Sequence, residues 1–476
     1  IADVEPGTYY LSAQRAGYVR QEYGARRSSR QGTALALTEG QEMKGLLIKL
    51  TPQGVITGKV LDEDAEPVTR ASVQALSQRY LRGKRQLAPA GMAQANDIGE
   101  YRLSGLAPGK YILSVTPQRP MDFGLRMRAP RKQEEDAYVT TYYPNVNDGS
   151  QALPIDVTAG GEMRGMDFRL HKIKTVHVRG TVIDGADNTP AQNAMVMLAP
   201  AGSTIMGAFG RNMAMIREGG AFDIPGVGPG SYSLVVNKMS REGRGASVHQ
   251  QVNVGNKDLD GLSIVLTPPF TLSGIVRMEG QDKPQFPNAR ILLDGMDGLT
   301  MNTPNATVAA DGTFTLQNVS AGQFRINITG LPANSYVKSV KAGNQEALET
   351  GADIAGPVPV EIVLSPNAGQ ITGSVQDAKQ QPLSGVTVVL APDASRRSQY
   401  WLFKTAATSQ TGGFTLSGIP PGEYTLLSWE DIEDGAYQDP DVVARYESQG
   451  KKITIKDGSS ETVQVQAIPA DGASQN

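Results

Sequence analysis

The chain has 476 residues and no cysteine, and its 45 basic and 48 acidic residues give a formal net charge of −3. This balance argues against nucleic acid or an anionic membrane as a partner, and the lack of cysteine excludes disulfides and thiolate metal sites. The sequence shows neither a signal peptide nor an apolar run of about 18 residues, so we expect no membrane insertion.

One short phrase occurs near the start of the chain and recurs four times. It joins a small apolar residue, a Pro-Gly or similar turn, and an aromatic residue two positions after the turn glycine. Proline presets φ for a turn, and we expect the glycine to take the positive φ of a type II turn between two strands. The spacing of about 100 residues indicates similar domains in series. The five copies are residues 4–9, 106–111, 227–232, 319–324 and 419–424.

Residues 1–52 contain only the second half of such a domain. They begin just before the turn and end with the alternation Leu46, Ile48 and Leu50. A half-domain would expose a sheet edge and an apolar face, which native proteins avoid. We therefore predict either that the chain is a segment of a longer precursor or that a neighbouring polypeptide covers residues 1–52.

Residues 53–171 form the first whole unit. An opening strand with a central glycine at 56–60 precedes a second strand at 71–75. The alternations 101–103 and 111–115 flank the Pro-Gly turn and predict a hairpin, and a closing strand is expected at 166–170. Two basic insertions make this unit the longest.

Three further units, 172–268, 269–366 and 367–476, repeat this order of elements. About seven short strands per unit, without a helical period, indicate a β-sandwich. The opening strands are expected at 178–182, 272–276 and 371–375, the second strands at 194–198, 289–293 and 386–390, and the hairpins at 222–234, 314–326 and 414–426.

The order of glycine strand, proline and alanine strand, D-x-G-x-[FY]-x-[LI] and L-x-P-G-x-[YF]-x-[LI] resembles the carboxypeptidase regulatory-like domain. That family is similar in fold to transthyretin and to Cna B-type repeats. The longer closing stretches resemble those of multi-repeat secreted proteins of Acidobacteria. The resemblance implies an all-β fold of tandem Ig-like or transthyretin-like, seven-stranded β-sandwiches, and it implies no peptidase activity.

Catalytic patterns are missing from the sequence. The three histidines, His171, His177 and His249, form no H-x-x-E or H-E-x-x-H motif, and no G-x-S-x-G, phosphate-loop or dinucleotide motif is present. We therefore predict that the protein is not an enzyme, with no catalytic, cofactor-binding or metal-binding residues and no cofactor.

Two acidic stretches are candidate metal sites. Residues 430–435, with Asp439 and Asp441, supply oxygen ligands of the kind that calcium prefers, but their spacing matches no twelve-residue calcium loop. We interpret this stretch as a solvated loop, with calcium binding as the alternative. Residues 62–64 are interpreted as a hairpin loop.

The basic insertions of the first whole unit are the candidate binding loops. They span 79–85 and 126–132, and Tyr138, Tyr142 and Tyr143 follow the second. Interleaved cations and aromatic rings could bind a glycan, nucleic acid or an acidic partner. The simpler interpretation is a long loop whose tyrosines pack on the sandwich. Of the two tryptophans, Trp401 and Trp429, we expect Trp429 in the core.

A lysine–asparagine crosslink, which Cna B-type relatives often carry, is not expected. Such a bond needs a lysine on the inward face of the opening strand, whereas Lys59 alternates outward. The matching positions of the other units hold Thr181, Ile275 and Ser374.

Short proline joins at 51–52, 267–269 and 365–367 predict a semi-rigid, extended rod. We favour an extracellular or cell-surface structural protein that self-associates into a fibre or layer. Two alternatives remain: a secreted adhesin whose first whole unit binds a glycan or protein, and the ancillary stalk of a larger secreted enzyme.

Overall fold

The computed structural model describes residues 1, 4–25, 32–117, 136–201, 212–238, 246–281, 285–296, 303–332 and 334–470. The fold is all-β. Four two-sheet sandwiches follow an N-terminal segment with three small sheets. Separate hydrophobic cores fall within residues 56–170, 176–266, 272–364 and 371–467. We call the four sandwiches units two to five, and residues 1–52 unit one.

Unit one consists of three antiparallel pairs, β1–β5, β2–β4 and β3–β6. Leu35 is the one buried apolar side chain among its described residues. Cover from a neighbouring chain therefore stays a prediction. Its strands are β1 Gly7–Tyr9, β2 Ser12–Ala13, β3 Tyr18–Val19, β4 Gln21–Glu22, β5 Leu35–Leu37 and β6 Thr51–Pro52.

Unit two packs a sheet around β7 against the sheet β13-β11-β8-β9, to which β14 adds. In the first sheet β10 pairs antiparallel with β7, whereas β15 and β16 pair parallel with it. Its strands are β7 Gly54–Leu61, β8 Ser72–Leu81, β9 Lys84–Gln94, β10 Glu100–Leu106, β11 Gly109–Thr116, β12 Asp136–Tyr138, β13 Thr141–Tyr142, β14 Ile155–Val157, β15 Glu162–Met163 and β16 Phe168–Arg169. β17 Lys172–Lys174 leads into unit three and pairs with β12.

Units three and four repeat this plan, with the closing strand parallel to the opening strand. Unit three comprises β18 Val176–Asp184, β19 Thr189–Pro190, β20 Ala194–Pro200, β21 Met213–Met215, β22 Ala221–Val227, β23 Gly230–Lys238, β24 Ser247–Val254 and β25 Leu259–Leu266. Unit four comprises β26 Phe270–Met278, β27 Arg290–Gly295, β28 Asn305–Thr307, β29 Thr313–Val319, β30 Gly322–Thr329, β31 Tyr336–Ala342, β32 Gln345–Glu346, β33 Ala352–Ile354 and β34 Val360–Ser365.

Unit five carries the one α-helix within the described ranges, α2 Pro440–Tyr446. Its strands are β35 Gly369–Gln376, β36 Thr387–Pro392, β37 Lys404–Ala407, β38 Gly413–Ile419, β39 Gly422–Trp429, β40 Lys451–Ile455 and β41 Ser460–Gln466. Short 3-10 turns are η1 Gly149–Gln151, η2 Glu218–Gly220, η3 Ala394–Arg396, η4 Tyr400–Leu402, η5 Ala436–Gln438 and η6 Glu447–Gln449. None of the described helices is long and apolar enough to cross a membrane.

The repeated Pro-Gly phrase has a different turn geometry from the one predicted. Gly109, Gly230 and Gly422 have the expected positive φ, but its values of 156°, 159° and 152° are far from the φ near +80° of a type II turn. The tyrosine two positions later explains the phrase better. In four of the five copies its hydroxyl donates to the carbonyl four residues upstream, and the bonds are Tyr9 to Glu5 at 2.8 Å, Tyr111 to Ala107 at 2.6 Å, Tyr232 to Gly228 at 2.9 Å and Tyr424 to Pro420 at 2.9 Å.

The central glycines of the opening strands, Gly58, Gly180, Gly274 and Gly373, mark a close approach between strands. A Cβ at Gly373 would lie 2.0 Å from the Val463 carbonyl oxygen of the closing strand. At Gly58 it would lie 2.2 Å from the Met166 oxygen, and at Gly180 2.3 Å from the Leu262 oxygen. Only glycine therefore lets the parallel closing strand pack this tightly.

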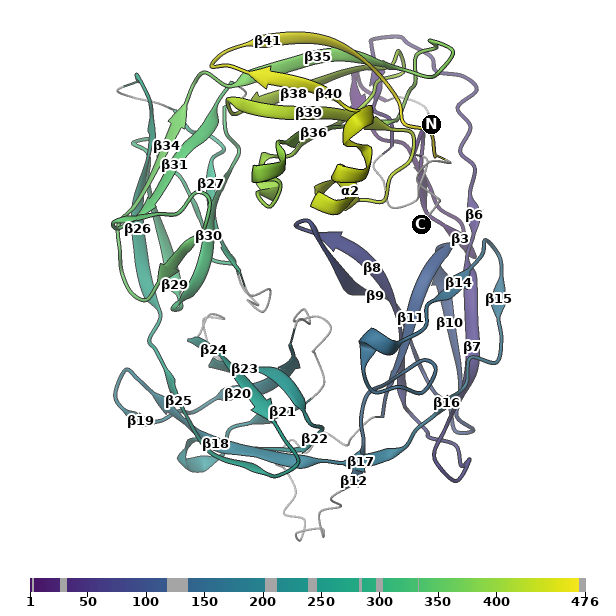
Figure 1. Cartoon of the computed structure of the whole chain (residues 1–476), viewed down its shortest axis with the longest axis vertical. Coiled ribbons are helices and arrows are strands. Elements are labelled where there is room, and N and C mark those ends of the chain that lie inside the picture. Colours follow the sequence, from purple (N-terminus) through teal and green to yellow (C-terminus); the bar gives the residue numbers. More distant parts are fainter. Residues whose placement is uncertain are drawn as a thin grey trace.

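The units do not form the extended rod that the proline joins predict. Figure 1 shows them curving around a central space, with unit five returning beside units one and two. In each of units two to five, the sheet with the opening and closing strands lies outside and the other sheet faces the centre; we call them the outer and inner sheets. Contacts between distant units, described below, make a straight rod incompatible with this structure.

Unit one closes this ring of units from the other end. The Gln53 side chain donates to the Tyr18 carbonyl at 3.1 Å, which ties unit one to the start of unit two. On unit five, a Cβ at Gly385 would lie 2.9 Å from the Gly24 oxygen, so the backbones of the two units meet there. Unit one thus bridges units two and five.

We expect Gly373→Ala to destabilise unit five by about 2–3 kcal/mol, because the new methyl group overlaps the Val463 carbonyl. Gly413→Ala, in the same unit, is the matched control, since its Cβ would meet nothing closer than 3.4 Å. Urea unfolding of both variants measures the effect. Equal losses in the two would contradict a close approach at Gly373.

Tyr424→Phe should lower stability by about 1 kcal/mol through loss of the hydrogen bond to Pro420. Burial raises the pKa of Tyr424 to about 12. Between its ordinary pKa near 10 and this value the folded state keeps a proton that the unfolded state loses, so stability falls as pH rises from 10 toward 12. Urea midpoints measured across this range should fall less steeply for Tyr424→Phe than for the parent chain.

Candidate functional site

The hairpin of β8 and β9 is the longest hairpin in the described part of the chain. These strands have 10 and 11 residues, whereas the equivalent β36 and β37 of unit five have 6 and 4. The hairpin reaches from unit two across the central space toward α2 of unit five (Figure 1). Its tip is the first basic insertion, residues 79–85.

Unit five offers the hairpin an apolar surface, which we call the seat. The seat consists of two parts: the face of the inner sheet that points away from the core of unit five, and the segment 430–446 that folds over this face. Trp429 in the seat is fully buried. Asp439 caps α2 by accepting from the Asp441 amide at 2.9 Å. The buried residues of the seat are Val389, Ala391, Phe403, Leu427, Trp429, Ile432, Ala436, Val443 and Ile468.

The hairpin tip meets the seat through one aromatic side chain and two glycines. Tyr80 packs against the apolar cluster. A Cβ at Gly83 would lie 2.6 Å from the Gln438 carbonyl oxygen, and one at Gly435 would lie 2.8 Å from the Tyr80 oxygen. Both glycines have positive φ, 74° and 77°. Glycine on both sides therefore lets the two backbones touch.

Arg82 at the tip extends this contact to unit four. Its Nη2 lies 3.1 Å from Oδ2 of Asp294 on β27. The Asn327 side-chain amide donates to the same Asp294 oxygen at 2.5 Å, which fixes the carboxylate. The Arg82 guanidinium also lies 5.8 Å from the ring centre of Tyr400 in unit five. A single side chain of unit two therefore contacts both distant units.

Arg325 of β30 completes the cluster. Its guanidinium stacks on Trp401 at 3.6 Å from the ring centre and donates to the carbonyls of Leu348 and Glu349 at 2.9 and 3.1 Å. The Tyr400 and Trp401 rings meet edge to face at 5.4 Å. Burial lowers the pKa of Arg325. A guanidinium tolerates such burial when its donors are paired and an aromatic face covers it.

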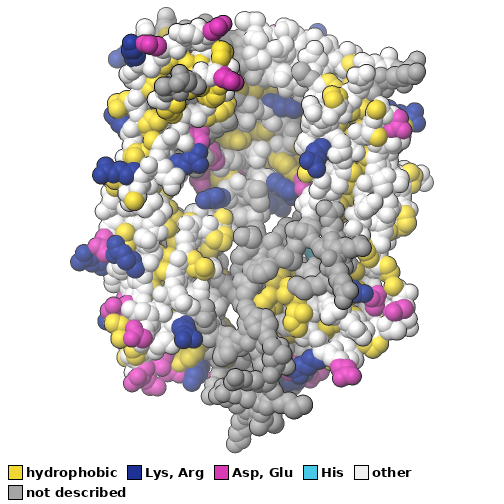
Figure 2. All heavy atoms as spheres, turned by 180° about the vertical axis from the view of Figure 1, so that it is seen from behind, with side chains coloured by type: hydrophobic (Ala, Val, Ile, Leu, Met, Phe, Trp, Pro, Cys, Tyr) yellow, Lys and Arg dark blue, Asp and Glu magenta, His cyan; other side chains and the backbone are white. Residues whose placement is uncertain are grey.

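Together, the tip residues 80–83, Asp294, Arg325, Tyr400, Trp401, Gly435 and Gln438 form what we call the hairpin junction. Lys and Arg side chains gather around the hollow at the centre of the molecule (Figure 2). The junction pairs cations with rings, carbonyls and a carboxylate, and its described side chains include no nucleophile beside a base. Its chemistry suits holding units two, four and five together.

The basic insertions thus have separate outcomes. Residues 79–85 contact their own chain, while 126–132 lie outside the described residues. The Tyr138 hydroxyl donates to Glu63 at 2.8 Å, and Lys172 lies 5.4 Å from the Tyr138 ring centre. Tyr143 packs edge-on against Phe168 at 6.2 Å. These two tyrosines pack on the sandwich, as the simpler interpretation predicts.

The acidic stretch 430–441 has exposed acidic side chains at Glu433, Asp434 and Asp441, whereas its apolar side chains are part of the seat. Ile432 and Ala436 are 5% exposed. His177 pairs with Asp223, Nδ1 to Oδ1, at 2.6 Å. Within the described ranges, no three His, Asp or Glu side chains form a group that could hold a metal ion.

Three smaller predictions concern single positions. Trp429 is in a core, as expected. Residues 62–64 form a turn, in which Asp62 accepts from the amides of Asp64 and Glu66 at 3.0 and 2.9 Å. Lys59 points outward, half exposed, with its Nζ 3.1 Å from Glu100. This geometry agrees with the expected lack of a crosslink at that strand.

No sequence pattern indicates Asp294 as a site residue. One signal was available for Arg325. It follows the aromatic residue of the repeated phrase, where units two, three and five carry Ile112, Ser233 and Thr425. A charge at that one position indicates that the inner sheet of unit four faces a polar partner.

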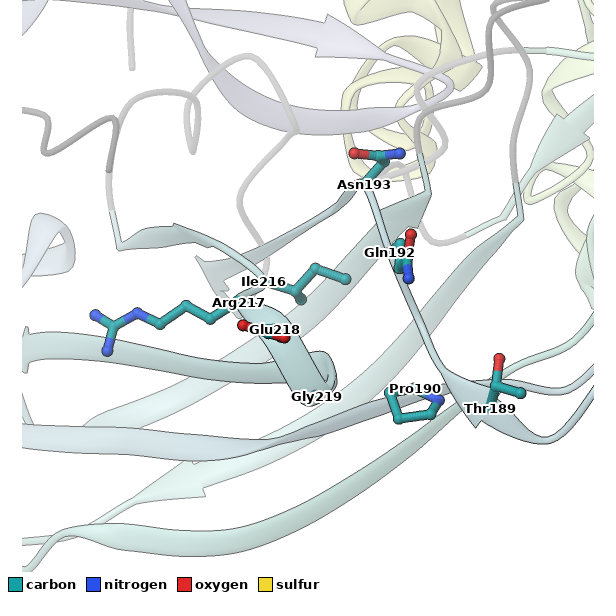
Figure 3. Close-up of a pocket in the computed structure, with 8 residues that line it drawn as sticks. All are labelled: Thr189, Pro190, Gln192, Asn193, Ile216, Arg217, Glu218 and Gly219. Atoms are coloured by element: carbon teal, nitrogen blue, oxygen red, sulfur yellow. The ribbon is translucent and has the colours of Figure 1, made fainter. Parts of the chain in front are cut away.

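A surface pocket of about 560 Å³ lies on unit three, between residues 189–193 and the turn 216–219. Gln192, Asn193, Arg217 and Glu218 are its longer polar side chains. Figure 3 shows Arg217 pointing away from Gln192 and Asn193. The polar groups do not converge on one point, as they do in a specific ligand site.

A comparison with protein families matches residues 370–467 to the carboxypeptidase regulatory-like domain. This match covers unit five. No curated protein matches the sequence significantly.

Solved structures similar to this chain include the Bacillus anthracis TIE protein, at 9% identity, covering 91% of this chain and 79% of that one, with a TM-score of 0.17. The Streptococcal ancillary pilin is 11% identical, with 62% and 99% covered and a TM-score of 0.21. BcpA, the major pilin subunit of Bacillus cereus, is 11% identical, with 87% and 99% covered and a TM-score of 0.17. Scores this low say nothing about the arrangement of the units or their role.

Arg325→Ala should lower the free energy of unfolding by about 2 kcal/mol, because it removes the stacking on Trp401 and leaves two carbonyls without their donor. Arg290→Ala is the control in the same inner sheet, since its guanidinium donates to the exposed Asn305 side chain and is not part of the junction. Urea unfolding compares them. A loss no larger for Arg325→Ala than for Arg290→Ala would show that the junction contributes little to stability.

Proposed function

We propose that this protein is a non-catalytic structural protein of the cell surface or extracellular space, which associates with copies of itself into a larger fibre or layer. The observation that carries the proposal is the use of the β8–β9 hairpin. Its strands form the longest hairpin among the described residues, and its basic tip is engaged by units four and five of its own chain. A loop used in this way holds a scaffold together.

The same observation weighs against the adhesin alternative. Free cations and rings are needed to grip a glycan or an acidic protein, yet Arg82 is paired with Asp294 and one face of Trp401 is covered by Arg325. The chemistry of the junction also supports a non-enzymatic role, because its polar groups are occupied in structural contacts.

Self-association is proposed to use unit one. Several of its apolar side chains face solvent: Tyr9 is 36% exposed, Tyr10 51% and Leu47 71%. Its strands pair only in twos, which leaves ladder edges for another strand. A second copy covering this surface would bury both features at once.

The purified chain should sediment as larger species as its concentration rises, and electron microscopy of the same samples should show ordered assemblies. The double variant Tyr10→Ser, Leu47→Ser should shift association to at least about tenfold higher concentration, since it removes apolar area from the contact. Leu153→Ser is the control, because Leu153 is 55% exposed but lies on unit two. Monomers at every concentration would overturn the proposal.

A further inference from the structure

The turn at the hairpin tip departs from the usual rule for such turns. Leu81 pairs with Lys84, so Arg82 and Gly83 form a two-residue loop. Their φ angles are 53° and 74°, as in a type I′ turn. Such turns favour Asn-Gly, because asparagine accepts positive φ far better than arginine does. Arginine at this position therefore costs backbone energy that the hairpin itself does not recover.

The contacts of Arg82 account for this cost. The guanidinium reaches Asp294 of unit four and Tyr400 of unit five, which asparagine is too short to do. A residue that is unfavourable for its own turn and favourable for a distant contact indicates that the contact matters. Arg82 therefore serves the junction rather than the hairpin.

The contact between the tip and its partners, which we call the seam, is weaker than any unit core. Arg82 and Asp294 keep side-chain exposures of 39% and 20%, so water screens their attraction. Each of units two to five, by contrast, has two hydrogen-bonded sheets around its own core. The seam can consequently open while all units remain folded.

We propose that the hairpin exchanges between copies, so that the tip of one chain occupies the seat and the Asp294 site of a second copy. Every copy carries both halves of the contact, and the glycines at 83 and 435 make the two surfaces complementary. At low protein concentration, the seat binds the hairpin of its own chain, because that hairpin is always nearby. At high protein concentration, the hairpin of a second copy competes for the seat and exchange is favoured. This inference rests on the proposed self-association and names a second contact for it.

Two single-cysteine chains test the exchange, because the protein has no cysteine of its own. Lys84→Cys lies two residues after Arg82, and Met296→Cys lies two residues after Asp294. Arg82 and Asp294 themselves therefore stay unchanged. The chains are mixed at high concentration, one enlarged by a fusion tag, and treated with a short bifunctional thiol crosslinker. The product that joins one chain of each size forms only by exchange, and we expect it to increase with concentration.

Arg82→Asn is the matched variant. It suits the type I′ turn better, so the hairpin stays folded, but it loses the contact with Asp294. We expect at least a fivefold lower yield of the mixed product. The chain carrying both cysteines should crosslink within itself at low concentration, which verifies the placement of the two positions.

The outcomes separate the two proposals. If the doubly substituted chain crosslinks internally and the mixed product never forms, exchange is refuted. In that case, larger species in sedimentation would still support self-association through unit one. Monomers at every concentration would refute both the self-association and the hairpin exchange. A mixed product that Arg82→Asn does not reduce would also refute exchange, since it would reflect random collision.

Discussion

The parallel pairing of the first and last strand of each unit is the constraint on which the architecture depends. In units three to five the closing strand lies beside the opening strand in the outer sheet. The chain therefore leaves a unit on the same layer where it entered. Only residues 267–269 separate β25 from β26, and 366–368 separate β34 from β35. These two short links join equivalent outer strands, which keeps the outer sheets of neighbouring units on the same side of the ring (Figure 1).

Closing such a ring needs contacts between units far apart in sequence, and these carry the functional argument. Loop-closure entropy rises slowly with chain length, so a modest contact can hold ends that short, stiff joins have already brought near. Unit one against unit five and the hairpin junction supply that contact. A ring held in this way is made rigid by its short, stiff joins between units as well as by the contacts at the seam.

Much of the fold could be predicted from the sequence because its signals are local. Alternation of apolar residues, the Pro-Gly phrase and the central glycines each report on neighbours within one unit. The type II turn predicted at Gly109 was wrong because a Pro-Gly pair indicates a positive φ at the glycine but does not specify its value, which is 156° here. The ring and the junction were missed, since Arg82 and Asp294 are over 200 residues apart and no local pattern links them. The proline joins indicate a stiff link, but a stiff link does not by itself specify the angle between consecutive units.

The two basic segments of unit two illustrate how placement decides the meaning of a charge pattern. As sequence, 79–85 read as cations interleaved with a tyrosine, which suits a soluble ligand as well as a protein contact. In the fold, Tyr80 lies in an apolar seat, Arg85 donates to the Tyr80 hydroxyl at 2.6 Å and Arg82 meets a fixed carboxylate. Tyr80, Arg82 and Arg85 are each matched by a partner from a different element. That matching is what a scaffold needs, and it explains why the longest of the described hairpins lies inside the ring.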